Sequence, residues 1–155
     1  MSTVDWLARK QALHAHCLAL ITERLDTVQA SLQGIEEARN NETKSSAGDK
    51  HETGRAMMQI QEEQLNQQLR RIADERSQLQ RIDPAVVCER GQPGALLRTG
   101  QGIYFLAVGL GRVTLNEEVY FCVSPQAPIG QLLLDKRAGD ALTFNGRRQR
   151  IEAIA

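Results

Sequence analysis

The strongest constraint on this chain is a regular repeat of apolar residues near its N-terminus. Between Val4 and Ile35, the residues of one stripe follow one another alternately at three and four positions, and most of them are apolar. This spacing is typical of the narrow seam of a coiled coil. No proline interrupts the segment, which as a helix would be about 48 Å long. The stripe consists of Val4, Leu7, Gln11, His14, Leu18, Ile21, Leu25, Val28, Leu32 and Ile35.

A second, less regular stripe lies between Met58 and Ile82, where Glu62 and Arg76 interrupt the apolar positions. Pro84 would end this helix, because the proline ring excludes the α conformation from the residue before it. Two helices that each have a thin apolar stripe, joined by a short linker, bury those stripes by pairing antiparallel. We therefore predict a long antiparallel α-helical coiled-coil hairpin over residues 1–83.

After Pro84 the sequence changes to short apolar runs separated by glycine, proline and asparagine, the pattern of strands and turns. We predict a small antiparallel β-sheet domain with one helix over residues 84–155, which places the whole chain in the α+β class. The expected strands and the expected helix cover residues 95–97, 103–108, 118–123, 129–134 (helix), 141–144 and 148–154.

Composition argues against several classes of protein. The formal net charge is zero, so the chain as a whole does not attract nucleic acid or anionic membranes strongly. The three cysteines are far apart and form no C-x-x-C pair, which argues against a disulfide framework and a zinc cage. Neither a signal-peptide pattern nor a run as long as a membrane span is present in the sequence. We expect a soluble, cytoplasmic protein that does not bind a membrane.

The linker between the two predicted helices, residues 40–55, is polar and contains three carboxylates, those of Glu42, Asp49 and Glu52. In a helical hairpin this linker would form the tip. The spacing of Asp49 and Glu52 also fits a capping box, in which Asp49 is the N-cap of the second helix and Glu52 occupies the third helical position. Spacing alone favours this structural role over a catalytic one.

Two stretches together resemble the Gre family of bacterial transcription elongation factors. Gly48-Asp49-Lys50-His51-Glu52 resembles the G-D-x-x-E-N motif at the tip of the family's coiled coil. The stretch from Ser124-Pro125 to Gly139-Asp140 resembles the S-P-I-x-x-x-L-I-G-K-x-x-G-D stretch of the family's C-terminal FKBP-like domain. Gre factors usually follow the acidic pair with asparagine and an aromatic residue, whereas this chain has Thr53 and Gly54, so it resembles a divergent member.

The resemblance implies that the chain binds RNA polymerase, inserts its coiled coil into the secondary channel and stimulates cleavage of backtracked RNA at the 3′ end. Asp49 would be a ligand of Mg²⁺ held jointly with the polymerase, and Glu52 would orient the attacking water or its metal. The protein would be a monomer that binds no cofactor and has no turnover by itself. Four further residues would make tip contacts, either as a solvated loop or with RNA phosphates: Glu42, Lys44, Lys50 and Arg55.

Other functions remain possible on the sequence alone. The chain could occupy the secondary channel and regulate transcription without cleavage, or it could be a coiled-coil adaptor whose sheet domain binds another protein. A prolyl isomerase is less favoured, because an FKBP-like fold does not by itself imply that activity and only 4% of the residues are aromatic.

Overall fold

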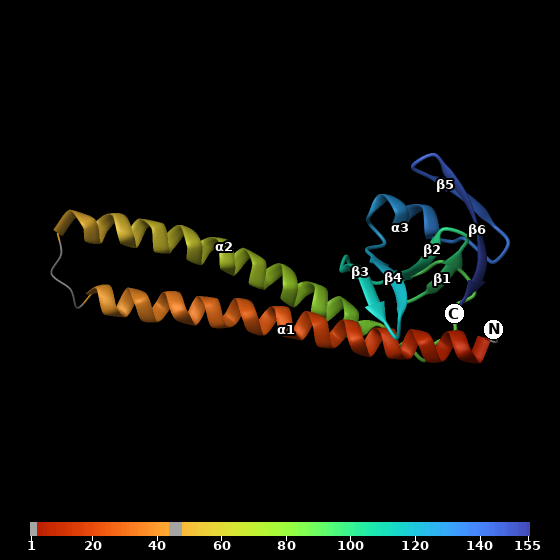
Figure 1. Cartoon of the computed structure of the whole chain (residues 1–155), viewed down its shortest axis with the longest axis horizontal. Coiled ribbons are helices and arrows are strands. Elements are labelled where there is room, and N and C mark those ends of the chain that lie inside the picture. The colour runs from red at the N-terminus through yellow and green to blue at the C-terminus, as the bar shows by residue number, and fades with distance from the viewer. Residues whose placement is uncertain (1–2, 44–47) are drawn as a thin grey trace. The chain divides into compact units, whose positions relative to one another are not determined.

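The computed structural model describes residues 3–43 and 48–155 of the chain, and the side chains of residues 5–41 and 53–155. Two long helices, α1 (Thr3–Thr43) and α2 (Gly48–Arg81), precede six strands and one short helix (Figure 1). This order confirms the predicted α+β class. The chain divides into two compact units, a helical unit (Ala19–Arg76) and a sheet unit (Met1–Leu18 with Ser77–Ala155). Within the described ranges, no helix has both the length and the apolar character needed to cross a membrane.

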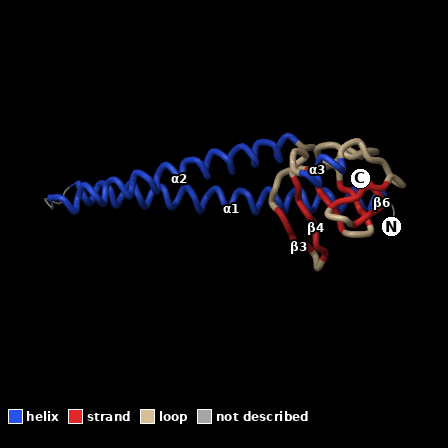
Figure 2. The backbone as a smooth tube through the Cα atoms, turned by 90° about the horizontal axis from the view of Figure 1, so that it is seen from above, coloured by secondary structure: helices blue, strands red, loops and turns tan. Residues whose placement is uncertain are grey.

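The sheet unit contains one six-stranded sheet with the order β3-β4-β2-β1-β6-β5, and Figure 2 shows its strands in red. The predicted antiparallel sheet is wrong in one respect, because β2 pairs with β4 in parallel and the sheet is therefore mixed. The reason is that β4, and not β3, lies against β2, while β3 forms an outer hairpin with β4. The bounds are β1 (Leu96–Thr99), β2 (Gly102–Leu106), β3 (Gly111–Leu115), β4 (Glu118–Val123), α3 (Pro128–Leu133), β5 (Ala141–Phe144) and β6 (Arg147–Ile154).

Two tight turns set the register of the outer strands. Asn116 and Glu117 join β3 to β4 with φ of 52° and 66°, and Asn145 and Gly146 join β5 to β6 with φ of 51° and 76°. Positive φ at both central residues is the requirement of a type I′ turn, whose twist matches that of the paired strands. Asn145 and Gly146, which separate the strands predicted at 141–144 and 148–154, therefore form a turn as expected.

The sheet has apolar side chains on both faces because neighbouring residues of a strand point to opposite sides. On β4, Cys122 faces α1, where its Sγ lies 3.6 Å from Sγ of Cys17. The next residue, Val123, contacts the apolar core on the α3 side. Each large apolar side chain that is fully buried contributes about 1.5–3 kcal/mol. The core on the α3 side is formed by Cys88, Ala95, Leu97, Leu106, Ile129, Leu133, Leu142 and Ile151.

The first part of α1 does not bury the stripe that the heptad pattern predicts. Gln11 is exposed and Leu7 and Leu18 are only partly buried. The buried face is instead shifted by one residue, because this part of α1 packs on the sheet rather than on a second helix alone. Farther along, Ile21, Leu25 and Val28 of the predicted stripe are buried, whereas Leu32 and Ile35 are only partly buried. The buried residues of α1 are Trp6, Lys10, Leu13, His14, Cys17, Ile21, Leu25 and Val28.

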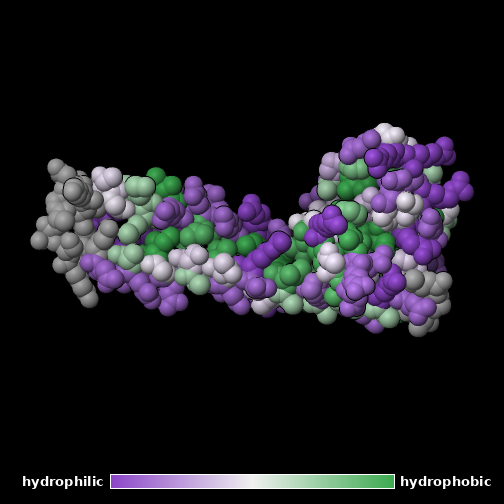
Figure 3. Space-filling view, viewed as in Figure 1, coloured by the Kyte–Doolittle hydropathy of each residue, from purple (hydrophilic) through white to green (hydrophobic). Residues whose placement is uncertain are grey.

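In the helical unit, α1 and α2 run side by side in opposite directions (Figures 1 and 2). Arg39 forms an ion pair with Glu62, whereas Arg24, earlier in α1, lies near Glu75, later in α2. Apolar atoms follow the line between the two helices, with polar residues on either side (Figure 3). From Thr53 to Arg76, however, all residues of α2 are exposed or only partly buried.

Candidate functional site

The acidic residues of the predicted tip lie next to the ends of the two long helices. Glu42 is at the end of α1, and Asp49 and Glu52 are in the first turns of α2, which begins at Gly48. The side chains of Asp49 and Glu52, and with them the predicted capping box, lie outside the described residues.

The side chains at this end fall mostly outside the described residues. This holds for Glu42, Asp49, Lys50 and Glu52, and Lys44 lies wholly outside the described ranges. Positions 49, 52 and 55 follow at three-residue steps along α2, and residues three apart occupy neighbouring turns of one helix face. Carboxylate oxygens, which aspartate and glutamate supply, are the hard donors that Mg²⁺ prefers.

Arg55 is the predicted tip contact whose side chain is described. It is exposed and lines a polar cavity of about 600 Å³ beside the ion pair between Arg39 and Glu62. Because the side chains of Arg39 and Glu62 are 39% and 35% exposed, this pair contributes no more than about 1 kcal/mol. Among residues with described side chains, no three histidine, cysteine or acidic groups gather where they could hold a metal ion.

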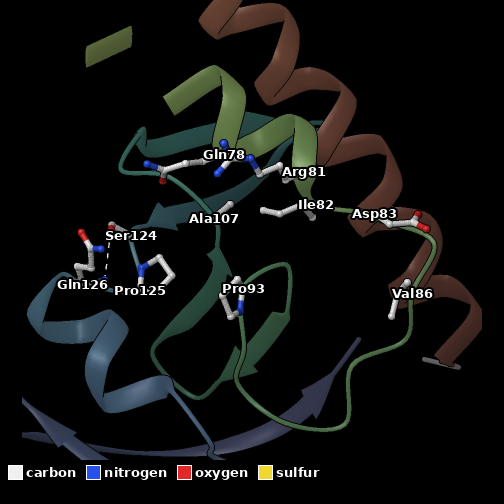
Figure 4. Close-up of a pocket in the computed structure, with 10 residues that line it drawn as sticks. All are labelled: Gln78, Arg81, Ile82, Asp83, Val86, Pro93, Ala107, Ser124, Pro125 and Gln126. Carbon is white, nitrogen blue, oxygen red and sulfur yellow. Dashed lines mark hydrogen bonds between the residues drawn. The ribbon is translucent and has the colours of Figure 1, made fainter. Parts of the chain in front are cut away.

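The Ser-Pro stretch of the second half lines a cavity of about 490 Å³ in the sheet unit (Figure 4). The Ser124 hydroxyl accepts a hydrogen bond from the backbone N–H of Gln126 at 3.1 Å, which closes a local turn around Pro125. Ile82 and Val86, which follow α2, contribute apolar surface on the opposite side of the cavity. The stretch that resembles the family's C-terminal motif is thus partly open to solvent.

Two polar residues of α1 are buried, Lys10, which lies off the predicted stripe, and His14, which lies on it. Nζ of Lys10, a fully buried residue, donates to the Val86 carbonyl at 2.5 Å and lies 3.7 Å from Sγ of Cys88. Burial lowers the pKa of Lys10, and the nearby Cys88 and Asp83 oppose this shift. Lysine side chains are normally exposed and Lys10 lies off the predicted stripe, so the sequence contains no signal for its burial.

His14 is the second of these residues. It lies on the predicted stripe, where a polar residue typically sets the register of a helix seam, and its Nε2 forms a hydrogen bond with the Leu79 carbonyl at 2.7 Å. Because a carbonyl can only accept, Nε2 must carry the proton. Leu79 is near the C-terminal end of α2, and its carbonyl also accepts a hydrogen bond from the backbone N–H of Ile82 at 3.2 Å. His14 therefore provides a second donor to this carbonyl at the end of α2.

Comparison with known proteins does not assign the chain to a family. It matches no protein-family model and no curated protein. The function is therefore argued from the residues and their arrangement.

Proposed function

We propose that the protein is a transcription elongation factor that binds RNA polymerase and stimulates cleavage of backtracked RNA. The observation that carries this proposal is the position of Asp49 and Glu52 at the start of α2, next to the end of a long antiparallel partner helix. A narrow pair of helices can enter a channel that a globular domain cannot. The acids would then reach an active centre that belongs to the polymerase.

The finer fold assignment is part of the same proposal. The helical unit would be an antiparallel coiled coil, and the sheet unit would be an FKBP-like domain that docks on the polymerase at the rim of the channel. Support comes from the antiparallel direction of α1 and α2 and from a sheet with one short helix on one face. The partly open Ser124-Pro125 stretch is available for contact with a partner.

The proposed chemistry needs little from this chain beyond two carboxylates. Asp49 would provide an oxygen ligand, and Glu52 would accept a hydrogen bond from the attacking water and so orient it. Mg²⁺ held jointly with the polymerase would lower the pKa of that water and neutralise charge on the phosphate. Arg55, one turn beyond Glu52, would contact an RNA phosphate. The chain would have no turnover by itself because the remaining ligands belong to the polymerase.

The test uses purified protein and a stalled, backtracked elongation complex. The wild-type protein is expected to shorten the RNA from its 3′ end, and Asp49→Ala and Glu52→Ala are each expected to slow this reaction at least tenfold, about 1.4 kcal/mol. Glu23→Ala, which removes an exposed carboxylate of α1 about 30 Å along the helix from its end at Thr43, is the matched control. If both tip variants cleave as fast as wild type, the catalytic role of the acids is wrong.

A second candidate function keeps the partner and omits the chemistry. It is favoured by Thr53 and Gly54, which stand where Gre factors usually have asparagine and an aromatic residue. The protein would then occupy the secondary channel and alter access to the active centre. Binding to polymerase in competition with an active cleavage factor, without cleavage, would support this function. Failure to bind polymerase would instead point to a helical adaptor for another protein.

A further inference from the structure

The α3 face of the sheet is only partly covered. Helix α3 has six residues and is therefore about 9 Å long, whereas six strands at about 4.8 Å spacing extend over about 24 Å. Beside α3 the sheet forms a cavity of about 580 Å³. This volume is typical of a site for a small molecule, which binds in a concave, mostly apolar cavity of about 300–1,000 Å³.

Three aromatic rings converge on this cavity, although only 4% of the residues in the chain are aromatic. Tyr104 of β2 and Phe121 of β4 lie with their ring centroids 5.7 Å apart and tilted by 33°, and Phe144 of β5 lines the same cavity. Gly102 allows this arrangement, because a Cβ at that position would lie 3.0 Å from a ring carbon of Phe121. All three rings are only partly buried, so their faces and edges are available to a flat apolar ligand.

The polar groups of the cavity favour an anion. Arg147 of β6 lines it, and the described residues provide no carboxylate that pairs with this guanidinium. The described lining residues include no aspartate or glutamate. Gln149 is buried, and its Oε1 accepts a hydrogen bond from the Thr99 hydroxyl at 2.7 Å, which fixes the orientation of its amide. A planar guanidinium at the rim of an aromatic cavity matches a carboxylate, which it can bind through two parallel hydrogen bonds.

We propose that this cavity binds a small molecule made of a flat aromatic ring with one carboxylate. The ring contacts Tyr104, Phe121 and Phe144, and the carboxylate binds Arg147. Ile129 of α3 closes the apolar end of the cavity. This site does not depend on the proposed role in transcription, because all of its residues belong to the sheet unit.

The test is a titration of the full chain with 2-naphthoate, in which binding is measured by calorimetry and by backbone amide shifts in NMR spectra. The matched probe is 2-naphthalenemethanol, which has the same ring and no charge. Arg147→Gln is compared with Arg148→Gln, which removes the same charge from the next residue of β6, on the opposite side of the strand. Tyr104→Leu removes a ring while keeping an apolar side chain and the charge of Arg147, so that the contribution of the ring is tested separately from that of the charge.

We expect saturable binding of 2-naphthoate with shifts near Gln101 and Asn145, and binding of the neutral probe at least fivefold weaker. Arg147→Gln should weaken 2-naphthoate binding at least fivefold and leave the neutral probe unchanged, and Tyr104→Leu should weaken both probes. Arg148→Gln should change neither. The proposal is overturned if 2-naphthoate does not bind saturably, if both probes bind equally well, or if the two arginine variants have equal effects.

Discussion

Lys10 is a cationic residue in a position where apolar residues are the rule. It is fully buried between α1 and the segment that follows α2, and the pKa of its ammonium group is lowered by burial. A buried cation that donates one strong hydrogen bond holds two segments together, but its desolvation offsets much of the gain. Lys10 therefore specifies which segments meet more than it stabilises the fold.

A substitution of Lys10 tests this balance through its pH dependence. Because the pKa is lower in the folded chain than in the unfolded one, the folded chain binds fewer protons between the two pKa values. The contribution of Lys10 to stability is therefore smallest at neutral pH and rises as the pH increases towards about 10.4. Lys10→Met should be at least as stable as wild type at pH 7, and its advantage should shrink at pH 10.

Urea unfolding of both proteins at the two pH values measures this difference. Lys136→Met, at a partly exposed lysine, controls for the loss of one positive charge. An advantage of Lys10→Met that grows with pH would show that burial does not dominate the environment of Lys10.

Gly91 is constrained by the backbone around it. A Cβ at this position would lie 1.8 Å from the Leu133 carbonyl oxygen, and Gly91 is held there by hydrogen bonds with Lys136 and Asp135 at 2.8 and 2.7 Å. Gly91→Ala should cost at least about 2 kcal/mol in the free energy of unfolding, because the backbone near α3 must move. Gly109→Ala, with open space around the added Cβ, should change it by less than about 0.5 kcal/mol. Equal stability of the two variants in urea unfolding would refute the close approach at Gly91.

At the scale of elements, local sequence patterns predicted the helices and most strands. They did not predict which strands pair with one another, because that pairing joins segments far apart in the sequence. The strand predicted at 118–123 matches β4, and the helix predicted at 129–134 is close to α3. The edge strand β3 was missed because it is short, begins with a glycine and buries little besides Val113. The parallel pairing of β2 with β4 could not be predicted, because it depends on which strand lies next to β2 in the sheet and not on the composition of either strand.

The two proposed sites differ in the same way, since one is local in the sequence and the other is not. The acids at positions 49 and 52 were identified from their spacing in one short stretch. The aromatic cavity is assembled from β2, β4, β5 and β6, so its residues are far apart in the sequence and no local motif identifies them. The heptad pattern failed in the first part of α1 because a helix that packs on a sheet buries a face chosen by the sheet.

The contact between α1 and β4 includes two of the three thiols of the chain, Cys17 and Cys122, and the third, Cys88, is also buried. The hydrogen bond to Cys17, together with burial, raises the pKa of Cys122. We expect all three thiols of the native protein to react with Ellman's reagent at least about 100-fold more slowly than in the unfolded chain, because reaction requires opening of the fold. A thiol that reacts at the unfolded rate in the native protein would mean that this contact is not closed in solution.

At the scale of the whole molecule, burial is distributed unevenly between the two units. The sheet unit has apolar cores on both faces of its sheet, whereas the described part of the helical unit buries only Ile21, Leu25 and Val28. A long helix with a thin buried face depends on its partner for stability, since isolated helices are marginal in water. The boundary between the units falls within α1, after Leu18. One continuous helix should therefore have two different local stabilities.

Hydrogen exchange along α1 can measure this difference directly. Amides from Leu13 to Leu18 should exchange as slowly as the slow amides of the sheet. Amides from Leu32 to Arg39 should exchange at least tenfold faster, because this segment opens without disrupting the core of the sheet unit. Leu25→Ala removes a buried side chain of the helical unit, at a cost of about 2–3 kcal/mol. It should speed exchange in the second segment and leave the first unchanged. If α1 instead exchanges uniformly, and this variant affects both segments equally, then the two units unfold together and the thin helical face is as stable as the core of the sheet.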